Sequence, residues 1–81
     1  MKVSNEWGVP NQLVIELDNG DVIFQSYDST IVIKRKGKVI LGNNWDYSQT
    51  TGKYRNLFLG ETKAETAKKI KSGEYVIDET L

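Results

Sequence analysis

The chain contains no cysteine and no histidine among its 81 residues. Without cysteine there is no disulfide, thiolate zinc site or cysteine nucleophile. Without histidine, the side chain that titrates near neutral pH is missing, which excludes Ser-His-Asp catalysis and histidine metal sites. The carboxylates show no metal-ligand spacing and the glycines form no phosphate-binding loop. We therefore expect no enzyme, no metal and no cofactor.

Long hydrophobic runs and an excess of charge are also absent. No apolar stretch approaches the roughly 18 residues that a membrane span needs, and the first dozen residues lack the apolar core of a signal peptide. Eleven basic and eleven acidic side chains give a net charge of zero, which argues against a polycation or an acidic DNA mimic. We expect a single cytoplasmic domain over residues 1–81 with no membrane contact.

Residues 12–27 have the alternating pattern of a β-hairpin, with QLVIELD and DVIFQSY on either side of Asn19-Gly20. Asn-Gly readily adopts the two positive φ angles of a type I′ turn, so the sequence predicts a two-residue loop. This register sets Asp18 against Asp21, an unfavourable like-charge pair that a longer loop would relieve. In the two-residue register, Leu17 lies opposite Val22, Ile15 lies opposite Phe24, and Leu13 joins them on the core side.

A second hairpin is predicted from the β-branched run at 30–35 and its partner at 38–41, joined around Lys36-Gly37. Pairing about that turn places Ile33 beside Ile40 and Val32 beside Leu41. Basic side chains crowd this tip and the later segment around Lys53. They either protect a sheet edge as ordinary surface charge or form a patch for phosphate or an acidic partner. The candidates for that patch are Lys34, Arg35, Lys36, Lys38, Lys53 and Arg55.

The sequence changes to a helical period after the second hairpin. Ser48 is a good N-cap for a first helix that ends at Gly60, although Gly52 favours a late start. Thr62 and Glu65 match a capping box that opens a second helix. The expected apolar faces are Tyr54, Leu57 and Phe58 on the first helix, and Ala64, Ala67 and Ile70 on the second.

The order of these elements predicts an α+β fold. Gly73 is expected to end the second helix, and residues 74–78 to return as a short strand with Tyr75 and Ile77 inward. Residues 1–11 form a loop or a short edge strand, since Pro10 cannot donate to a sheet. We expect an antiparallel four- to five-stranded β-meander packed on one face by a C-terminal helical hairpin.

The aromatic side chains between residues 44 and 60 have two interpretations. The simpler one is that they clamp a helix onto the sheet. The alternative is that exposed aromatic and arginine side chains serve as anchors for a binding partner. The candidate anchors are Tyr27, Trp45, Tyr47 and Arg55.

The segments QSYDSTIV, WDYSQTTGKYRNLFLG and ETKAETAKKIKSGEY, between Gln25 and Tyr75, resemble a family of small proteins of unknown function from phages and mobile elements, mainly of Gram-positive hosts. The WDYS-x-TT-x-KY spacing is the specific part. The resemblance implies a phage or plasmid setting, and hence the cytoplasm of a bacterial host, and a standalone domain. It carries no activity, so no functional residue is transferred.

Three functions follow as hypotheses. The first is a binding protein that inhibits or modulates a host protein, such as a defence component, or that contacts another phage protein. The second is a nucleic-acid-binding module that uses the basic patch with an aromatic for base stacking. The third is a small-molecule module, for instance for nucleotides, with a pocket between sheet and helices. The oligomeric state is left open.

Overall fold

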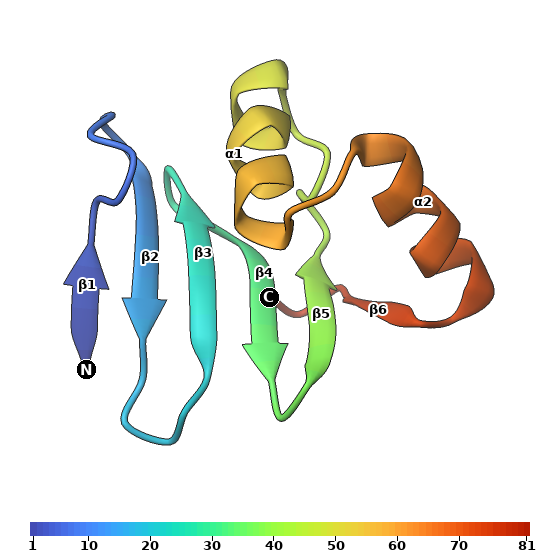
Figure 1. Ribbon diagram of the computed structural model, residues 1–81, viewed down its shortest axis with the longest axis horizontal. Coiled ribbons are helices and arrows are strands. Elements are labelled where there is room, and N and C mark those ends of the chain that lie inside the picture. The colour runs from blue at the N-terminus through green and yellow to red at the C-terminus, as the bar shows by residue number, and fades with distance from the viewer.

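A single sheet of six strands forms the body of the molecule, and its strands lie side by side in chain order (Figure 1). Two helices are inserted between the fifth and sixth strands. The computed structural model describes residues 1–81. The elements are β1 (Lys2–Ser4), β2 (Gln12–Glu16), β3 (Val22–Ser26), β4 (Ser29–Arg35), β5 (Lys38–Gly42), α1 (Gln49–Leu59), α2 (Lys63–Ser72) and β6 (Tyr75–Asp78).

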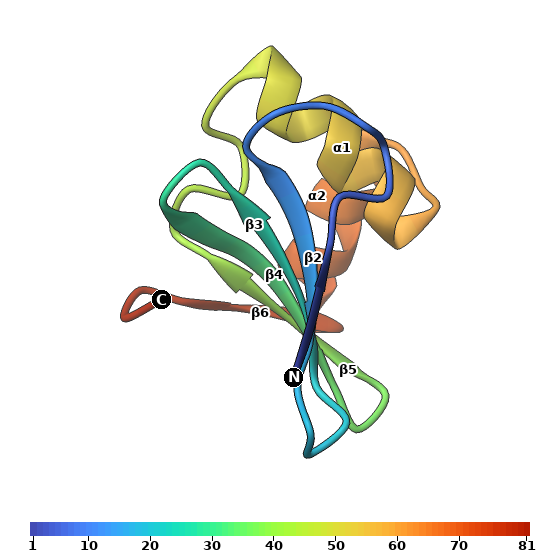
Figure 2. The same cartoon turned by 90° about the vertical axis from the view of Figure 1, so that its left-hand side faces the viewer.

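The predicted α+β class is confirmed, with both helices on one face of a mostly antiparallel sheet (Figure 2). The sheet has six strands where four to five were expected, because β1 pairs at one edge and β6 at the other. β6 runs parallel to β5, since the chain returns through both helices before it pairs. The opposite face of the sheet has no helix on it (Figure 2).

The register predicted for the first hairpin is wrong by one residue. Val14 pairs with Phe24, and Ile15 pairs with Ile23 rather than with Phe24. Because side chains alternate between the two faces of a strand, this shift turns all of β2 over. Val14 is therefore buried on the helix side. Leu13 and Ile15, which were expected in the core, are half-buried on the uncovered face.

A longer turn accompanies the shift. Residues 18–20 form a three-residue loop, closed by a hydrogen bond of 2.9 Å from the Leu17 N–H to the Asp21 carbonyl. Gly20 has a φ of 96°, the positive value that such loops need at their last position. The buried Asp21 carboxylate is paired with Arg35 Nε at 2.8 Å. The predicted two-residue type I′ turn does not form, and its like-charge pair is avoided.

The second hairpin forms as predicted, with Val32 opposite Leu41 and Ile33 opposite Ile40. Its turn at Lys36-Gly37 has positive φ at both central residues, 51° and 77°. This is the type I′ signature that the sequence suggested for the first hairpin. The turn holds the basic tip at the same end of the sheet as the β2–β3 loop (Figure 1).

The caps of α1 are where the sequence places them. Ser48 Oγ accepts a hydrogen bond from the Thr51 N–H, and Gly60 ends the helix with a φ of 70°. The expected late start is wrong, because the helix begins at Gln49 and includes Gly52. A favourable N-cap outweighs the propensity cost of one glycine, which is about 1 kcal/mol.

The predicted capping box of α2 is confirmed, since Thr62 and Glu65 each accept from the other's backbone N–H. Gly73 ends this helix in the left-handed conformation. The predicted apolar faces are only partly right. Tyr54, Phe58 and Ile70 pack against the core, whereas Leu57, Ala64 and Ala67 are exposed and the buried helical positions include Thr51, Arg55 and Thr66.

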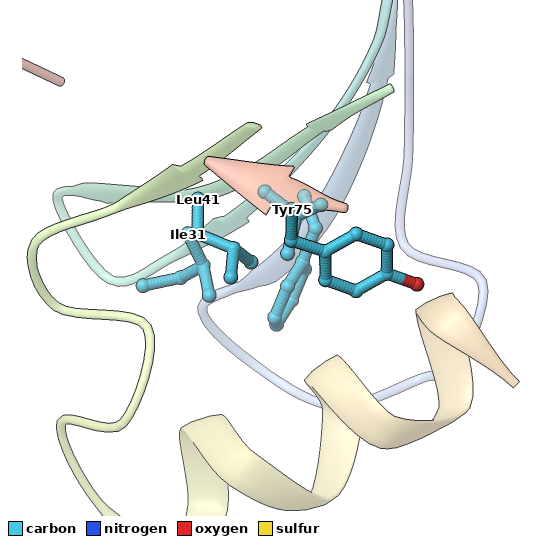
Figure 3. Packing of buried hydrophobic residues seen from close by; sticks show 5 residues of the cluster. Ile31, Leu41 and Tyr75 are labelled. Carbon is cyan, nitrogen blue, oxygen red and sulfur yellow. The ribbon is translucent and has the colours of Figure 1, made fainter. Parts of the chain in front are cut away.

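The core lies between the sheet and the helices. Figure 3 shows Ile31, Leu41 and Tyr75 gathered on the helix side of the sheet, with the Tyr75 hydroxyl directed away from the other two. Trp7 covers this cluster from the N-terminal loop, with its ring centroid 5.5 Å from Phe24. Tyr75 and Ile77 point inward from β6, as predicted. The aromatic clamp expected between helix and sheet is confirmed for Trp45, Tyr54 and Phe58.

A buried carboxylate ties the helices to the last strand. Glu61 Oε1 accepts hydrogen bonds from Lys69 Nζ at 2.7 Å and from the Tyr75 hydroxyl at 2.8 Å, and its Oε2 accepts from Thr66 Oγ1 at 2.6 Å. Burial would raise the pKa of Glu61, but these hydrogen bonds and the Lys69 charge outweigh it and lower the pKa below its usual value.

Candidate functional site

The β3–β4 turn, the β5–α1 connection and the first turn of α1 lie at the same end of the sheet (Figure 1). A hollow of about 570 Å³ lies between these three segments. Most of the lining side chains carry a hydroxyl or an amide. We call this surface the tyrosine end and define it as Tyr27, Asp28, Ser29, Asn44, Tyr47, Ser48 and Thr50.

Two exposed aromatic rings belong to the tyrosine end. Tyr27 is 48% exposed and Tyr47 is 69% exposed. Both were predicted as binding anchors from the sequence. Neither belongs to the buried core cluster or to the partly buried side chains packed on it. Their rings are therefore available to a partner.

Tyr27 sits in a conformation that a tyrosine rarely adopts. Its φ is 55°, in the left-handed region, which costs a residue with a Cβ roughly 1–2 kcal/mol. The Tyr27 N–H donates to the Asn11 carbonyl at 2.7 Å, and the Tyr27 carbonyl accepts from Gln25 Nε2 at 3.0 Å. Glycine or asparagine would suit this backbone better. A half-exposed, strained tyrosine in a tight turn is a feature more typical of function than of packing.

Hydrogen bonds hold the loops of the tyrosine end together. Asn44 Nδ2 donates to Ser29 Oγ at 3.0 Å, which joins the β5–α1 connection to the start of β4. Beneath the hollow, Ser26 Oγ and Thr51 Oγ1 lie 2.9 Å apart and join β3 to α1. Gln12, whose buried amide makes no hydrogen bond within the protein, is the strand partner of Ser26. The walls of the hollow are thus fixed by side-chain contacts.

Arg55 was expected as an exposed anchor, and that expectation is wrong. It is 1% exposed, and its Nη1 donates to the Trp45 carbonyl at 2.6 Å while Nη2 donates to Asn56 Oδ1 at 3.0 Å. The guanidinium also lies over the Trp45 ring, 5.1 Å from its centroid. Burial lowers the pKa of Arg55, and the nearby Asp46 carboxylate offsets part of this effect. Arg55 and the half-buried Trp45 therefore hold the β5–α1 connection in place.

The predicted basic patch is not one surface. The β4–β5 tip and the start of α1 lie at opposite ends of the sheet (Figure 1). Lys34 Nζ donates to the Phe58 carbonyl at 2.9 Å and caps the end of α1. Arg35 is paired with Asp21, and Lys53 lies over the Tyr54 ring at 5.4 Å. Of the six candidates, Lys36 and Lys38 alone are exposed without an ion pair or ring contact.

Comparison with known proteins identifies a family. A family model described as "Family of unknown function (DUF8033)" matches residues 2–74. The chain belongs to the DUF8033 family. No curated protein and no solved structure matches it. The match begins well before Gln25, where the resemblance seen in the sequence began, so the family features include the first three strands of the sheet.

No group of three or more Asp or Glu side chains is placed to hold a metal ion. Neither helix has the length and hydrophobicity that crossing a membrane requires.

Sequence reasoning found the two tyrosines of the DUF8033 chain but missed the polar residues around them. Ser48 was predicted only as a helix cap, and Asp28, Ser29 and Asn44 are small polar residues of the kind that turns and loops favour. Each does have that local role, as the Ser48 cap shows. The signal that could have found them is composition, because Tyr, Asp and Ser occur together both at 26–29 (SYDS) and at 46–48 (DYS).

Proposed function

We propose that this DUF8033 protein acts by binding a partner protein at its tyrosine end. Exposed Tyr27 and Tyr47 beside a polar hollow are the observation that supports this. Tyrosine offers a large amphipathic contact area with little conformational entropy to lose, and Ser and Asn supply adaptable hydrogen bonds. The same combination is enriched in surfaces selected for protein recognition.

The resemblance to small phage proteins extends the proposal. A compact chain without histidine or cysteine lacks the side chains that most often carry catalysis. In a phage or mobile element, such a chain would act as an inhibitor or modulator of a host protein, for instance a defence component. Binding at the tyrosine end would block that protein by occupying its surface. This setting is the reason to search for the partner in a lysate of a Gram-positive bacterium.

Affinity capture with matched variants tests the proposal. The tyrosine variant carries Tyr27→Ala and Tyr47→Ala, and the control carries Lys36→Ala and Lys38→Ala at the other end of the sheet. We expect wild type and the lysine control to retain the same host protein at stoichiometric level and the tyrosine variant to lose it. Equal capture by all three would refute the tyrosine end. If the lysine control alone loses the captured material, and nuclease treatment releases that material from wild type, nucleic-acid binding is favoured instead.

The hollow itself favours a small molecule as the second candidate. Its volume of about 570 Å³ lies within the range of ligand pockets, and a tyrosine at its rim can stack on a planar ring such as a nucleobase. A specific ligand must raise the melting temperature, because it binds only the folded state. A nucleotide screen by thermal shift, repeated on the tyrosine variant, tests this candidate. No shift with any nucleotide would reject it.

A further inference from the structure

Most aromatic rings of this protein already have a partner within the chain. Four of them lie beneath a basic side chain, with the charge 4.3–5.4 Å from the ring centroid. These pairs are Lys34 on Phe58, Lys53 on Tyr54, Arg55 on Trp45 and Lys69 on Tyr75. Trp7 and Phe24 meet edge to face in the core. Tyr27 and Tyr47 alone have neither a cation nor another ring against them.

Asp28 is the only charged residue that lines the hollow of the tyrosine end. Tyr27 and Asp28 are the two residues between β3 and β4, so a ring and a carboxylate leave the backbone at the same tight turn. Asp28 is exposed and takes part in no ion pair, unlike the paired carboxylates, which are Asp18, Asp21, Asp46, Glu61 and Glu74. Its charge is therefore free to pair with a cation that a partner brings.

The first turn of α1 also borders the hollow, and a helix N-terminus by itself favours an anion. This helix is already capped, because Ser48 Oγ accepts from the Thr51 N–H at 3.1 Å. No lysine or arginine lines the hollow, so an anion there would meet the Asp28 carboxylate with no basic side chain to bind it. The electrostatics of the tyrosine end therefore favour a cationic group.

We propose that the tyrosine end receives an arginine side chain of the partner protein, with its guanidinium paired with Asp28 and in contact with the rings of Tyr27 and Tyr47. This inference rests on the proposed function, since it names the group that the partner inserts there. A guanidinium stacks on aromatic faces, and its planar fork matches the two oxygens of a carboxylate. The hollow of about 570 Å³ has room for the whole side chain.

The polar lining of the hollow favours arginine over lysine. A guanidinium has five N–H donors in fixed directions, so after pairing with a carboxylate it still needs acceptors. Asn44 Nδ2 is used by Ser29 Oγ at 3.0 Å, which leaves Oδ1 of the exposed Asn44 to accept. Arginine is also enriched over lysine where protein surfaces meet. The lining thus offers the arginine a carboxylate, a carbonyl oxygen and two rings.

Titration of isotope-labelled protein with a capped Gly-Arg-Gly peptide, followed by nuclear magnetic resonance, tests the site without any partner. The control peptide carries citrulline, which keeps the shape of arginine but has no charge. We expect the arginine peptide to shift the amide resonances of Tyr27, Asp28 and Tyr47 saturably, and the citrulline peptide to bind at least about tenfold more weakly. Equal binding of the two peptides, shifts confined to other surfaces, or no shift up to about 50 mM peptide would overturn the proposal. So would shifts of these amides by inorganic phosphate but not by the arginine peptide.

Asp28→Asn tests the charge, because it keeps the shape of the side chain. It should weaken binding of the arginine peptide about threefold to fivefold and leave the citrulline peptide unaffected. The matched control is Glu16→Gln, since Glu16 is exposed and pairs with Val22 at the end of β3 away from Tyr27. It should bind like wild type, and melting curves verify that both variants fold.

The outcomes separate this inference from the proposed function. Wild-type affinity in Asp28→Asn, or a host protein that wild type and Asp28→Asn capture equally well, would overturn the arginine site and leave the proposed function standing. Binding of the arginine peptide at the tyrosine end, with no host protein captured by wild type, would support the site and count against the proposed function.

Discussion

Gly42, at the end of β5, shows how a single residue is fixed by its surroundings. A Cβ built at Gly42 would overlap the Thr30 carbonyl oxygen. Gly52 in α1 is different, since a Cβ there would meet Arg55 Nη2 at an ordinary 3.6 Å. The two glycines are therefore present for different reasons, and the same substitution should have opposite effects on them.

We expect Gly42→Ala to lower the free energy of unfolding by about 2–3 kcal/mol, because the backbone at Thr30 must move to admit the methyl group. Gly52→Ala should raise it by up to about 1 kcal/mol through helix propensity. Urea denaturation of the two variants measures both values. A neutral Gly42→Ala would mean that the Thr30 carbonyl lies too far from Gly42 to contact the added methyl group.

Arg55 provides the second test at this scale. Arg55→Lys keeps the charge but loses the planar fork that reaches both the Trp45 carbonyl and Asn56. We expect a loss of about 2–3 kcal/mol in unfolding free energy, since buried acceptors lose their partner. Lys53→Arg, on the exposed side of α1, should change stability by less than about 0.5 kcal/mol. Denaturation curves that coincide for wild type and Arg55→Lys would show that the guanidinium is not buried.

At the scale of elements, Glu61 joins the α1–α2 connection to α2 and β6 through Thr66, Lys69 and Tyr75. Its pKa is lowered in the folded state, so its contribution to stability is present above the ordinary value of 4.5 and is lost as the pH falls below it. Wild-type stability should therefore decline from pH 4.5 downward.

Glu61→Gln should lower stability at neutral pH by about 2–3 kcal/mol, because a charged acceptor of three hydrogen bonds is removed. It should also flatten the decline in acid. Melting temperatures of wild type and variant between about pH 3 and pH 7 would show the two curves converging as the pH falls. Parallel curves would assign the acid sensitivity to other carboxylates.

The elements whose signals are local could be predicted from the sequence. Ser48, Thr62, Gly60 and Gly73 mark helix ends correctly because a cap depends only on its nearest neighbours. The register of β2 could not be predicted in this way. Asn19-Gly20 permits more than one loop length, and the choice between them depends on which face of β2 packs against the helices. The parallel pairing of β6 was also out of reach, because it depends on where two helices return the chain.

Part of the candidate site could also be predicted from the sequence. Tyr27 and Tyr47 stand out in the sequence as large residues in loops. The separation of Lys53 from the β4–β5 tip is a tertiary property, and so is the burial of Arg55 behind Trp45. A run of basic residues therefore suggested one patch where the fold forms two unrelated surfaces.

At the scale of the whole molecule, the sheet carries both helices on one face (Figure 2), and the tyrosine end lies where α1 begins. The register of β2 decides which of its side chains reach the core, because it buries Val14 and turns Ile15 to the uncovered face. The most direct measurement is thermal unfolding of Val14→Lys and Ile15→Lys at low protein concentration. The account predicts that Val14→Lys does not fold, because it buries an unpaired charge, while Ile15→Lys melts cooperatively. A folded Val14→Lys and an unfolded Ile15→Lys would contradict it.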